Sequence, residues 1–390
     1  MRRLTAGGRR SGAQGASPGW TGCCVCGQVC AMHEQARPPK VLKGRGAASQ
    51  VAHRFARDTR MILDDGWPGE DVEAAVPLAT EVRWEDARSA LVHNDSPDIA
   101  FEAAINPYRG CEHGCSYCYA RPTHSYLGLS PGLDFETVII AKRGLAQQLQ
   151  RELARPAYRP SLVVIGSATD CYQPVERELK ITRSLIEVLH ATRHPFSLIT
   201  KSGGVLRDLD LIAPMAADRL AAIYVTITTL DGTLARQLEP RAASPQRRLQ
   251  TIRALADAGV PVGVSVAPQI PFLNDDMEQV LEAAAAAGAC AAFYTVLRLP
   301  WELKEVFQQW LSLHYPQRAA RVMARVREMR GGLDYRSDFA TRMQGSGVWA
   351  ELIRQRFLKA CARHGLNRER VALDLSQFRA GLARGQGSLF

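Results

Sequence analysis

The stretch AFEAAI at residues 100–105, followed by RGCEHGCSYCYARP at residues 109–122, decides the fold. A short apolar run that ends at a cluster of chemically active side chains is typical of a buried strand and the loop after it. The loop places Cys111, Cys115 and Cys118 within eight positions, in the spacing C-x3-C-x2-C. The sequence therefore predicts a metal site immediately after a strand.

The cysteine loop lacks the fourth ligand of an ordinary structural zinc site. Such a site takes four protein ligands, commonly as two separated pairs, and residues 100–390 contain no second C-x2-C pair. His113 lies between the first two cysteines, but a residue inside so tight a loop has trouble pointing inward with them. An iron–sulfur cluster also accepts a compact loop, and three cysteines on four irons leave one iron for a substrate or cofactor.

Apolar, β-branched runs recur along the chain with helical patterns between them. The runs are AFEAAI (100–105), SLVVIGS (161–167), FSLIT (196–200), AAIYVTIT (221–228), PVGVSVA (261–267) and AAFYTVLR (291–298). The helical patterns cover residues 144–155, 181–192, 206–217, 245–259 and 275–288. This alternation predicts βαβ units and a parallel sheet. The sheet is either doubly wound or a barrel, and in both cases chemistry belongs at the carboxyl ends of the strands.

The cysteine loop, with the aromatic Tyr117 just before its last cysteine, resembles the radical S-adenosylmethionine superfamily. The resemblance is closer to the branch that includes spore photoproduct lyase and its uncharacterised bacterial relatives. It is carried by INPYRGCEHGCSYCYARPTHSYLGL, VVIGSATDCYQPVERELKITRSLIEVL, LITKS, RDLDLIAPMA, LEPRAASPQRRLQTIRALADAGVPVGVSVAPQIPFLND and YTVLRLP. It implies an α/β fold with a partial (β/α)6 TIM-type barrel, which we expect over residues 100–315.

The resemblance also implies the cofactors. Cys111, Cys115 and Cys118 would hold a [4Fe-4S] cluster, and S-adenosylmethionine would chelate the fourth iron. An electron donor of the flavodoxin or ferredoxin type would reduce the cluster. The cofactor is then cleaved to a 5′-deoxyadenosyl radical, which removes hydrogen from an unreactive carbon. The protein supplies binding, orientation and exclusion of water, while the cofactor supplies the chemistry.

Polar residues after the predicted strands are the candidates for contact with S-adenosylmethionine. They are Tyr117, Thr169, Asp170, Glu176, Lys201, Ser265 and Arg298. Asp170 has a second interpretation as a cap of the next helix, and Lys201 as a ligand of a substrate phosphate or a surface lysine. Ser265 and Arg298 are also explained as polar filling at strand ends.

Cys171 and Tyr172 are candidates for returning a hydrogen atom to a product radical, because the S–H bond of a thiol and the O–H bond of a phenol are weak enough to give up hydrogen to such a radical. Spore photoproduct lyase uses a cysteine near this loop, but its position corresponds to Ser167 here. The role is therefore not carried over directly, and a packed thiol is the alternative interpretation of Cys171. Cys290 and Cys361 are expected to be inert core thiols.

Charge is unevenly distributed along the 390 residues, whose formal net charge is +10. Residues 1–60 carry 11 basic and 2 acidic side chains, residues 316–390 carry 15 and 6, and the middle is mildly acidic. Basic flanks suggest nucleic acid or another polyanion as a partner, with a solvated basic surface as the alternative. The chain lacks a membrane-length apolar run and a secretory signal, so we expect a cytoplasmic location without a membrane partner.

Segments outside the core are predicted from composition. Residues 1–60 are expected to be a disordered basic segment, in which residues 1–31 are an upstream extension from an over-called start, and Cys23, Cys24, Cys26 and Cys30 form no metal site. Residues 61–99 form a lead-in, residues 316–382 a basic helical region with helices at 316–330 and 349–365, and residues 383–390 a flexible tail.

The last residues, QGSLF (386–390), resemble the Q-x-x-L-F peptide that docks bacterial repair and replication proteins on the DNA sliding clamp. Leu389 and Phe390 would insert into an apolar pocket. Together with the basic flanks, this favours DNA as the substrate and lyase-type repair of a DNA lesion as the reaction. The alternatives are radical chemistry on RNA, protein or a metabolite, and a metal-containing nucleic-acid-binding module without turnover.

Overall fold

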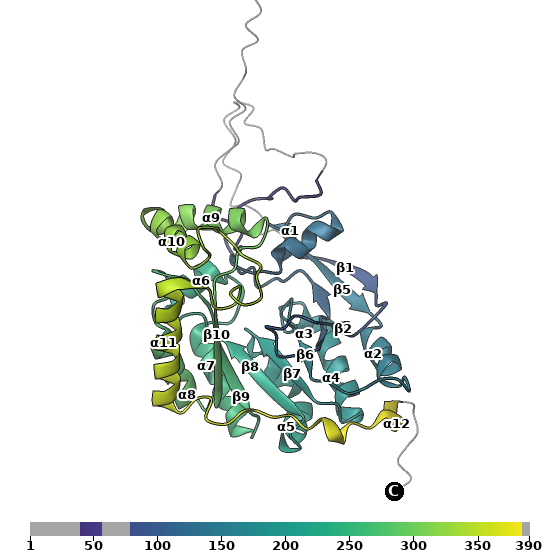
Figure 1. Ribbon diagram of the computed structural model, residues 1–390. Coiled ribbons are helices and arrows are strands. Elements are labelled where there is room, and N and C mark those ends of the chain that lie inside the picture. Colours follow the sequence, from purple (N-terminus) through teal and green to yellow (C-terminus); the bar gives the residue numbers. More distant parts are fainter. Residues whose placement is uncertain (1–39, 57–78, 384–390) are drawn as a thin grey trace, which may run out of the picture. The chain divides into compact units, whose positions relative to one another are not determined.

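The computed structural model describes residues 40–56 and 79–383 (Figure 1). Its larger sheet has seven strands. Their order is β10-β9-β8-β7-β6-β3-β2, and all neighbours are parallel except β2 and β3. The strands are β2 (Val92–His93), β3 (Ala103–Ile105), β6 (Val163–Ile165), β7 (Phe196–Thr200), β8 (Ala221–Thr226), β9 (Val262–Gln269) and β10 (Ala291–Val296). The six predicted strands and their parallel pairing are confirmed.

Helices connect the parallel strands. Those at the predicted positions are α2 (Leu145–Leu153), α4 (Ile181–Ala191), α5 (Leu209–Ala217), α7 (Pro245–Asp257) and α8 (Met277–Ala286). The short helices α3 (Glu176–Leu179) and α6 (Gly232–Leu238) were not predicted. Helix α7 shows how the sequence sets these bounds: the Ser244 side chain accepts from the amide of Arg247, and Pro245 occupies the first turn. Gly259, with φ of +75°, then turns the chain toward β9.

The core lies on both faces of the parallel sheet. The strand residues of β6 are all buried, as are most of those of β8 and β9. Because residues pointing to both faces of these strands are buried, the strands read as continuous apolar runs in the sequence. In the described part of the chain no pairing joins β10 to β3, so the sheet is open. Barrel curvature remains a prediction.

A second sheet, which the sequence did not indicate, supports the cysteine loop. It has the order β1-β5-β4, with β1 (Glu81–Asp86) parallel to β5 (Val138–Arg143) and β4 (Tyr108–Arg109) antiparallel to it. β4 lies between β3 and Cys111. The chain therefore passes from a strand of the larger sheet to a strand of the second sheet just before the cysteine loop begins. Because β1 is mostly exposed, its sequence lacks the apolar signal of the core strands.

Residues 40–56 correct the prediction that residues 1–60 are disordered. Ala47 and Val51 are buried, and the amides of Gly46 and Ala47 donate to the Glu136 carboxylate at 3.0 and 2.8 Å. A Cβ on Gly46 would lie 1.7 Å from the carbonyl oxygen of Gly114, so only glycine permits this approach to the cysteine loop. Residues 1–39, including the four N-terminal cysteines, residues 57–78 and the QGSLF peptide lie outside the described residues.

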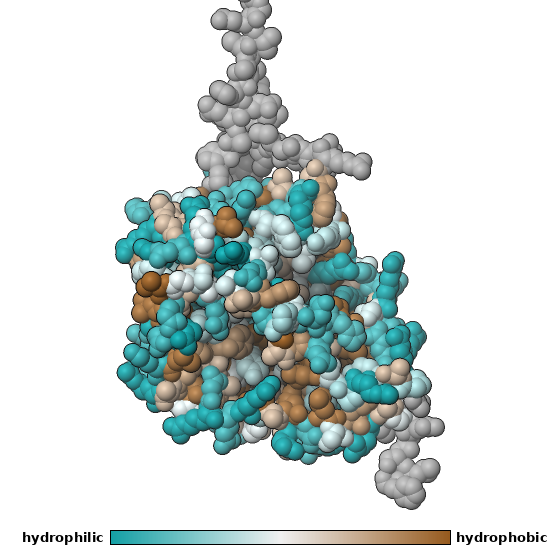
Figure 2. Space-filling model, viewed as in Figure 1, coloured by the Kyte–Doolittle hydropathy of each residue, from teal (hydrophilic) through white to brown (hydrophobic). Residues whose placement is uncertain are grey.

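The C-terminal region is helical, as predicted. It contains α10 (Pro316–Glu328), which packs on α9 (Leu303–His314), and α11 (Gly347–His364), which packs on α8. The remaining short helices are η1 (Arg121–Leu127), α1 (Asp134–Thr137), η2 (Gly203–Asp208), η3 (Leu375–Gln377) and α12 (Ala380–Ala383). Hydrophilic residues cover most of the face seen in Figure 2. Among the described helices, none has the length and apolar character to cross a membrane.

Candidate functional site

The cysteine loop lies at the carboxyl end of the first parallel strand. Two turns shape it, in which the amide of Gly114 donates to the Cys111 carbonyl at 3.2 Å and that of Cys118 to the Cys115 carbonyl at 3.3 Å. Gly114 has φ of +66°, and a Cβ there would lie 2.6 Å from a Glu136 carboxylate oxygen. Glycine is therefore required between the first two cysteines.

A buried arginine fixes the backbone of this loop. Arg121 is 0% exposed and donates to the carbonyl oxygens of Gly114 at 3.0 Å, Cys115 at 2.8 Å and Gly132 at 2.8 Å. Its guanidinium also pairs with the buried carboxylate of Glu136. Sequence reasoning missed both charged residues, because nothing in their local pattern indicates burial.

The three predicted ligands carry free thiols, and Cys115 and Cys118 are near enough to Cys111 to influence its ionisation. Burial raises the pKa of the Cys111 thiol, and the Asp170 carboxylate and the Cys115 and Cys118 thiols raise it further. Burial likewise raises the pKa of Cys115 to about 12. Such thiols resist ionisation until a metal offsets the charge, so this soft, three-thiol donor set is chemically suited to iron or zinc.

The loop offers three thiols as donors. Within residues 40–56 and 79–383, no group of three His, Cys, Asp or Glu side chains is arranged around one metal-ion position. Three cysteines suit a four-iron cluster, in which they leave one iron for another ligand. The buried Ser116 hydroxyl inside the loop has no protein partner among the described residues. These residues fit a [4Fe-4S] group.

Asp170 organises the loops around the cysteines. Its carboxylate accepts from the Thr200 hydroxyl at 2.7 Å, the Lys201 amide at 2.6 Å and the Tyr172 amide at 2.9 Å, and lies 3.3 Å from His113 Nδ1. Burial raises the pKa of Asp170, but His113 and these hydrogen bonds outweigh burial and hold it below its usual range. The bond to Tyr172 is a local turn, so Asp170 caps no helix, and His113 faces the carboxylate.

A second buried network surrounds Tyr117 and Lys201. The Tyr117 hydroxyl donates to the Glu239 carboxylate, which also accepts from Thr228 and pairs with Arg248. Lys201 Nζ lies 5.9 Å from the centre of the Tyr117 ring. Burial lowers the pKa of Lys201, but Cys115 and Glu239 outweigh it, so the pKa is raised and the ammonium stays charged beside the cysteine loop.

Thr169 and Glu176 bind the protein's own groups. The Thr169 hydroxyl donates to the Tyr108 carbonyl at 3.1 Å. The Glu176 carboxylate accepts from the Tyr108 hydroxyl, from the Thr182 amide at 3.1 Å and from Arg207 at 3.0 Å. Both side chains therefore hold β4 and α4 in place.

The remaining candidates are divided between the site and the core. The Arg298 guanidinium lies 4.1 Å from the centre of the Tyr119 ring, next to Cys118, and Ser265 is buried in β9. Cys171 is fully buried in the main apolar core, and the Tyr172 hydroxyl donates to Asp208 at 2.7 Å. The structure thus brings Lys201 and Arg298 to the cysteine side, whereas Cys171 packs in the core.

Comparisons with known proteins agree with this geometry. The family model for the radical SAM superfamily matches residues 105–284. An uncharacterized protein of Mycobacterium tuberculosis is 38% identical over 240 residues, which cover 60% of this chain and 70% of the relative. An uncharacterized protein of Methanocaldococcus jannaschii is 26% identical over 213 residues, which cover 55% of this chain and 76% of the relative.

Solved structures with a similar arrangement include a spore photoproduct lyase with bound AdoMet and dinucleoside spore photoproduct. It has 18% identity and a TM-score of 0.48, over 73% of this chain and 80% of that chain. The family match, the close curated relative and the three-cysteine loop after the first parallel strand lead to one conclusion. The chain belongs to the radical SAM superfamily.

Proposed function

We propose that this protein is a radical SAM enzyme that abstracts hydrogen from a nucleic-acid substrate, with lyase-type repair of a DNA lesion as its reaction. The observation that carries the chemistry is the set of three buried or part-buried thiols in one loop at the carboxyl end of the sheet. When bound, a [4Fe-4S] cluster supplies the electron that cleaves S-adenosylmethionine. Cys111, Cys115 and Cys118 would hold the cluster.

The chain's own residues would position S-adenosylmethionine. Lys201, charged beside Cys115, suits the cofactor carboxylate, and Arg298 beside Cys118 provides a second cation. Asp170 and Glu176 would act as positioning residues: Asp170 binds the Thr200 hydroxyl and the Lys201 amide, and Glu176 binds the Thr182 amide and Arg207. Tyr117 would contribute through its contact with Glu239, Thr169 through its bond to the Tyr108 carbonyl, and Ser265 from its buried position in β9.

The substrate class rests on sequence features and on the related protein. The basic N- and C-terminal flanks suit a polyanion, and the structurally similar spore photoproduct lyase binds a dinucleoside lesion. Radical chemistry on RNA, a protein or a metabolite is the alternative, and a non-catalytic nucleic-acid-binding module is the competing class. A cytoplasmic flavodoxin or ferredoxin would be the electron donor.

Anaerobic reconstitution tests the proposed chemistry. We expect a brown protein that binds iron and sulfide and releases 5′-deoxyadenosine on reduction in the presence of S-adenosylmethionine. A colourless protein that binds zinc alone would contradict the proposal. Deuterium-labelled DNA lesions, RNA and peptides would then be compared, because transfer of deuterium into 5′-deoxyadenosine identifies the molecule that loses hydrogen.

The sliding-clamp contact is a separate proposal. QGSLF would dock on the clamp, and deletion of residues 386–390 would then abolish retention of the protein on immobilised clamp. Unchanged retention after the deletion would rule out this contact without affecting the radical chemistry.

A further inference from the structure

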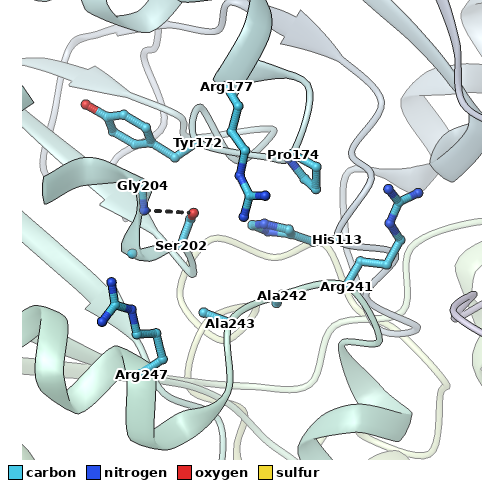
Figure 3. A pocket seen from close by; sticks show the side chains of 11 residues that line it. His113, Tyr172, Pro174, Arg177, Ser202, Gly204, Arg241, Ala242, Ala243 and Arg247 are labelled. Atoms are coloured by element: carbon cyan, nitrogen blue, oxygen red, sulfur yellow. Dashed lines mark hydrogen bonds between the residues drawn. The ribbon is translucent and has the colours of Figure 1, made fainter. Parts of the chain in front are cut away.

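A cavity of about 450 Å³ lies beside the cysteine loop, and Figure 3 shows its lining. Its walls come from the segments that follow four successive strands of the sheet: His113 after β3, Tyr172 and Arg177 after β6, Ser202 to Gly204 after β7, and Arg241 to Arg247 after β8. The cavity therefore lies at the carboxyl edge of the sheet, where parallel α/β sheets bind ligands.

The lining is cationic. Arg177, Arg241 and Arg247 contribute three guanidinium groups, and the lining contains neither Asp nor Glu. Arg241 forms an ion pair with Glu112 at 3.2 Å. In the described part of the chain, no carboxylate lies within ion-pair distance of Arg177 or Arg247. The cavity thus has a surplus of positive charge that a bound anion would neutralise.

Buried groups behind the arginines give the cavity a fixed floor. His113 lines it and is only 2% exposed. Its Nδ1 atom lies 3.3 Å from the Asp170 carboxylate, which also binds the Thr200 hydroxyl and the Lys201 amide. The buried Asp170 carboxylate therefore connects His113 to Thr200 and Lys201, which directly precede Ser202. Binding an anion here would require little rearrangement of the floor.

Glycine at position 203 makes room for one of the arginines. A Cβ at Gly203 would lie 3.2 Å from Nε of Arg247, a tight contact. The Ser202 hydroxyl accepts from the Gly204 amide at 3.1 Å and so shapes the same wall (Figure 3). The absence of a side chain at Gly203 lets Arg247 lie along this wall.

We propose that this cavity binds a phosphate ester, with Arg177, Arg241 and Arg247 as its ligands. The planar guanidinium group matches the geometry of phosphate oxygens and forms paired hydrogen bonds with them. The volume of the cavity falls within the range of small-molecule sites. Two sources carry the same chemistry, the backbone of a nucleic-acid strand and a free nucleotide. Neither the cluster nor S-adenosylmethionine contains phosphate, so this site goes beyond the proposed cofactor site.

The test compares two double variants of equal charge change in the reconstituted protein. Arg177→Glu with Arg247→Glu removes two cavity ligands, whereas Arg155→Glu with Arg370→Glu changes two exposed arginines outside the cavity. Fluorescence anisotropy measures binding of fluorescein-labelled oligothymidylate, and calorimetry measures binding of adenosine monophosphate. Thermal unfolding checks that both variants fold.

We expect the cavity variant to bind at least one of the two probes about tenfold or more weakly, and the control variant to bind as the wild type does apart from a small general loss. Loss of oligothymidylate binding alone identifies a strand backbone, and loss of adenosine monophosphate binding identifies a free nucleotide. Both results support the proposal.

The proposal would be overturned by equal affinities in the two variants, by absence of binding of both probes to the wild type, or by displacement of the bound probe by S-adenosylmethionine. A cavity variant that bound both probes normally but was reduced slowly by flavodoxin would also overturn it, in favour of docking of an acidic reductant. Release of 5′-deoxyadenosine by the wild type is scored separately. Failure of the radical chemistry is thereby distinguished from failure of the phosphate site.

Discussion

The guanidinium of Arg121 and the carboxylate of Glu136 form an ion pair in which both side chains are 0% exposed. Arg121 also binds the carbonyls of Gly114 and Cys115, and Glu136 binds the amides of Gly46 and Ala47. The pair thus joins the cysteine loop to Gly46 and Ala47, and Gly46 lies 90 positions before Glu136 in the chain. The loop is held in shape by the protein before any metal binds.

Removing Arg121 should therefore destabilise the protein and impair cluster assembly. Arg121→Met leaves the Glu136 charge buried without a counter-ion, and the expected cost is about 3–5 kcal/mol in the free energy of unfolding. The double variant Arg121→Met with Glu136→Gln should recover part of this loss. Denaturant unfolding measures both. Arg83→Met is the control, because its pair with Glu81 is exposed and screened by solvent, so the variant should unfold much as the wild type does.

Each of the three loop cysteines should be necessary for iron binding. Cys111→Ala, Cys115→Ala or Cys118→Ala removes one of three thiolates, and we expect the reconstituted variant to lose its brown colour and most of its iron. Cys290, which the sequence wrongly predicted to lie in the core, is exposed and provides a matched control, since Cys290→Ala should retain the iron content of the wild type. Equal iron loss in Cys290→Ala would show that the colour arises from iron bound non-specifically.

Lys201 should contribute to the affinity for S-adenosylmethionine without holding the cluster. Lys201→Gln removes the ammonium beside Cys115, and a charge-assisted hydrogen bond to the cofactor carboxylate is expected to be worth about tenfold in affinity. Calorimetry on the reconstituted protein measures the affinity, with iron content as the check on assembly. Lys304→Gln, an exposed lysine on α9, is the control. Unchanged affinity in Lys201→Gln would remove this residue from the cofactor site.

His194 should make the fold sensitive to mild acid. Burial lowers the pKa of His194 to about 4, and its ring contacts the Tyr158 hydroxyl at 2.6 Å and the Pro195 carbonyl at 2.9 Å. The unfolded chain takes up the proton near pH 6.5, so the neutral ring favours the folded state above that pH, and stability is lost as the pH falls toward 4. We expect a loss of about 2 kcal/mol between pH 7 and pH 5.

Urea unfolding across this pH range checks the prediction for His194. The variant His194→Gln lacks the titrating ring and should show a clearly smaller loss over the same interval. Identical pH dependence in wild type and variant would assign the acid sensitivity to other groups.

The roles of Cys171 and Tyr172 as hydrogen donors are tested by comparing the amount of product formed with the amount of S-adenosylmethionine cleaved. Because Cys171 is fully buried in the core, we expect Cys171→Ala to lower stability while leaving product formation per cleaved cofactor unchanged. A variant that cleaves S-adenosylmethionine normally but loses product would instead assign hydrogen donation to the thiol. Tyr172→Phe, which removes only the hydroxyl that binds Asp208, provides the same comparison for the phenol.

The sequence by itself determined the chemistry and the order of the core. Three cysteines at C-x3-C-x2-C indicate the donor set, and the apolar runs at 100–105 and 161–167 form parallel strands as predicted, because both signals are local in the chain. The tertiary structure decided how this chemistry is held. The Glu136 carboxylate binds the Gly46 amide, and the Glu239 carboxylate binds the Tyr117 hydroxyl. The cavity is lined by three arginines that are separate in the sequence: Arg177, Arg241 and Arg247. Charged side chains become buried only through contacts with partners that are distant in sequence, and no local periodicity records such contacts.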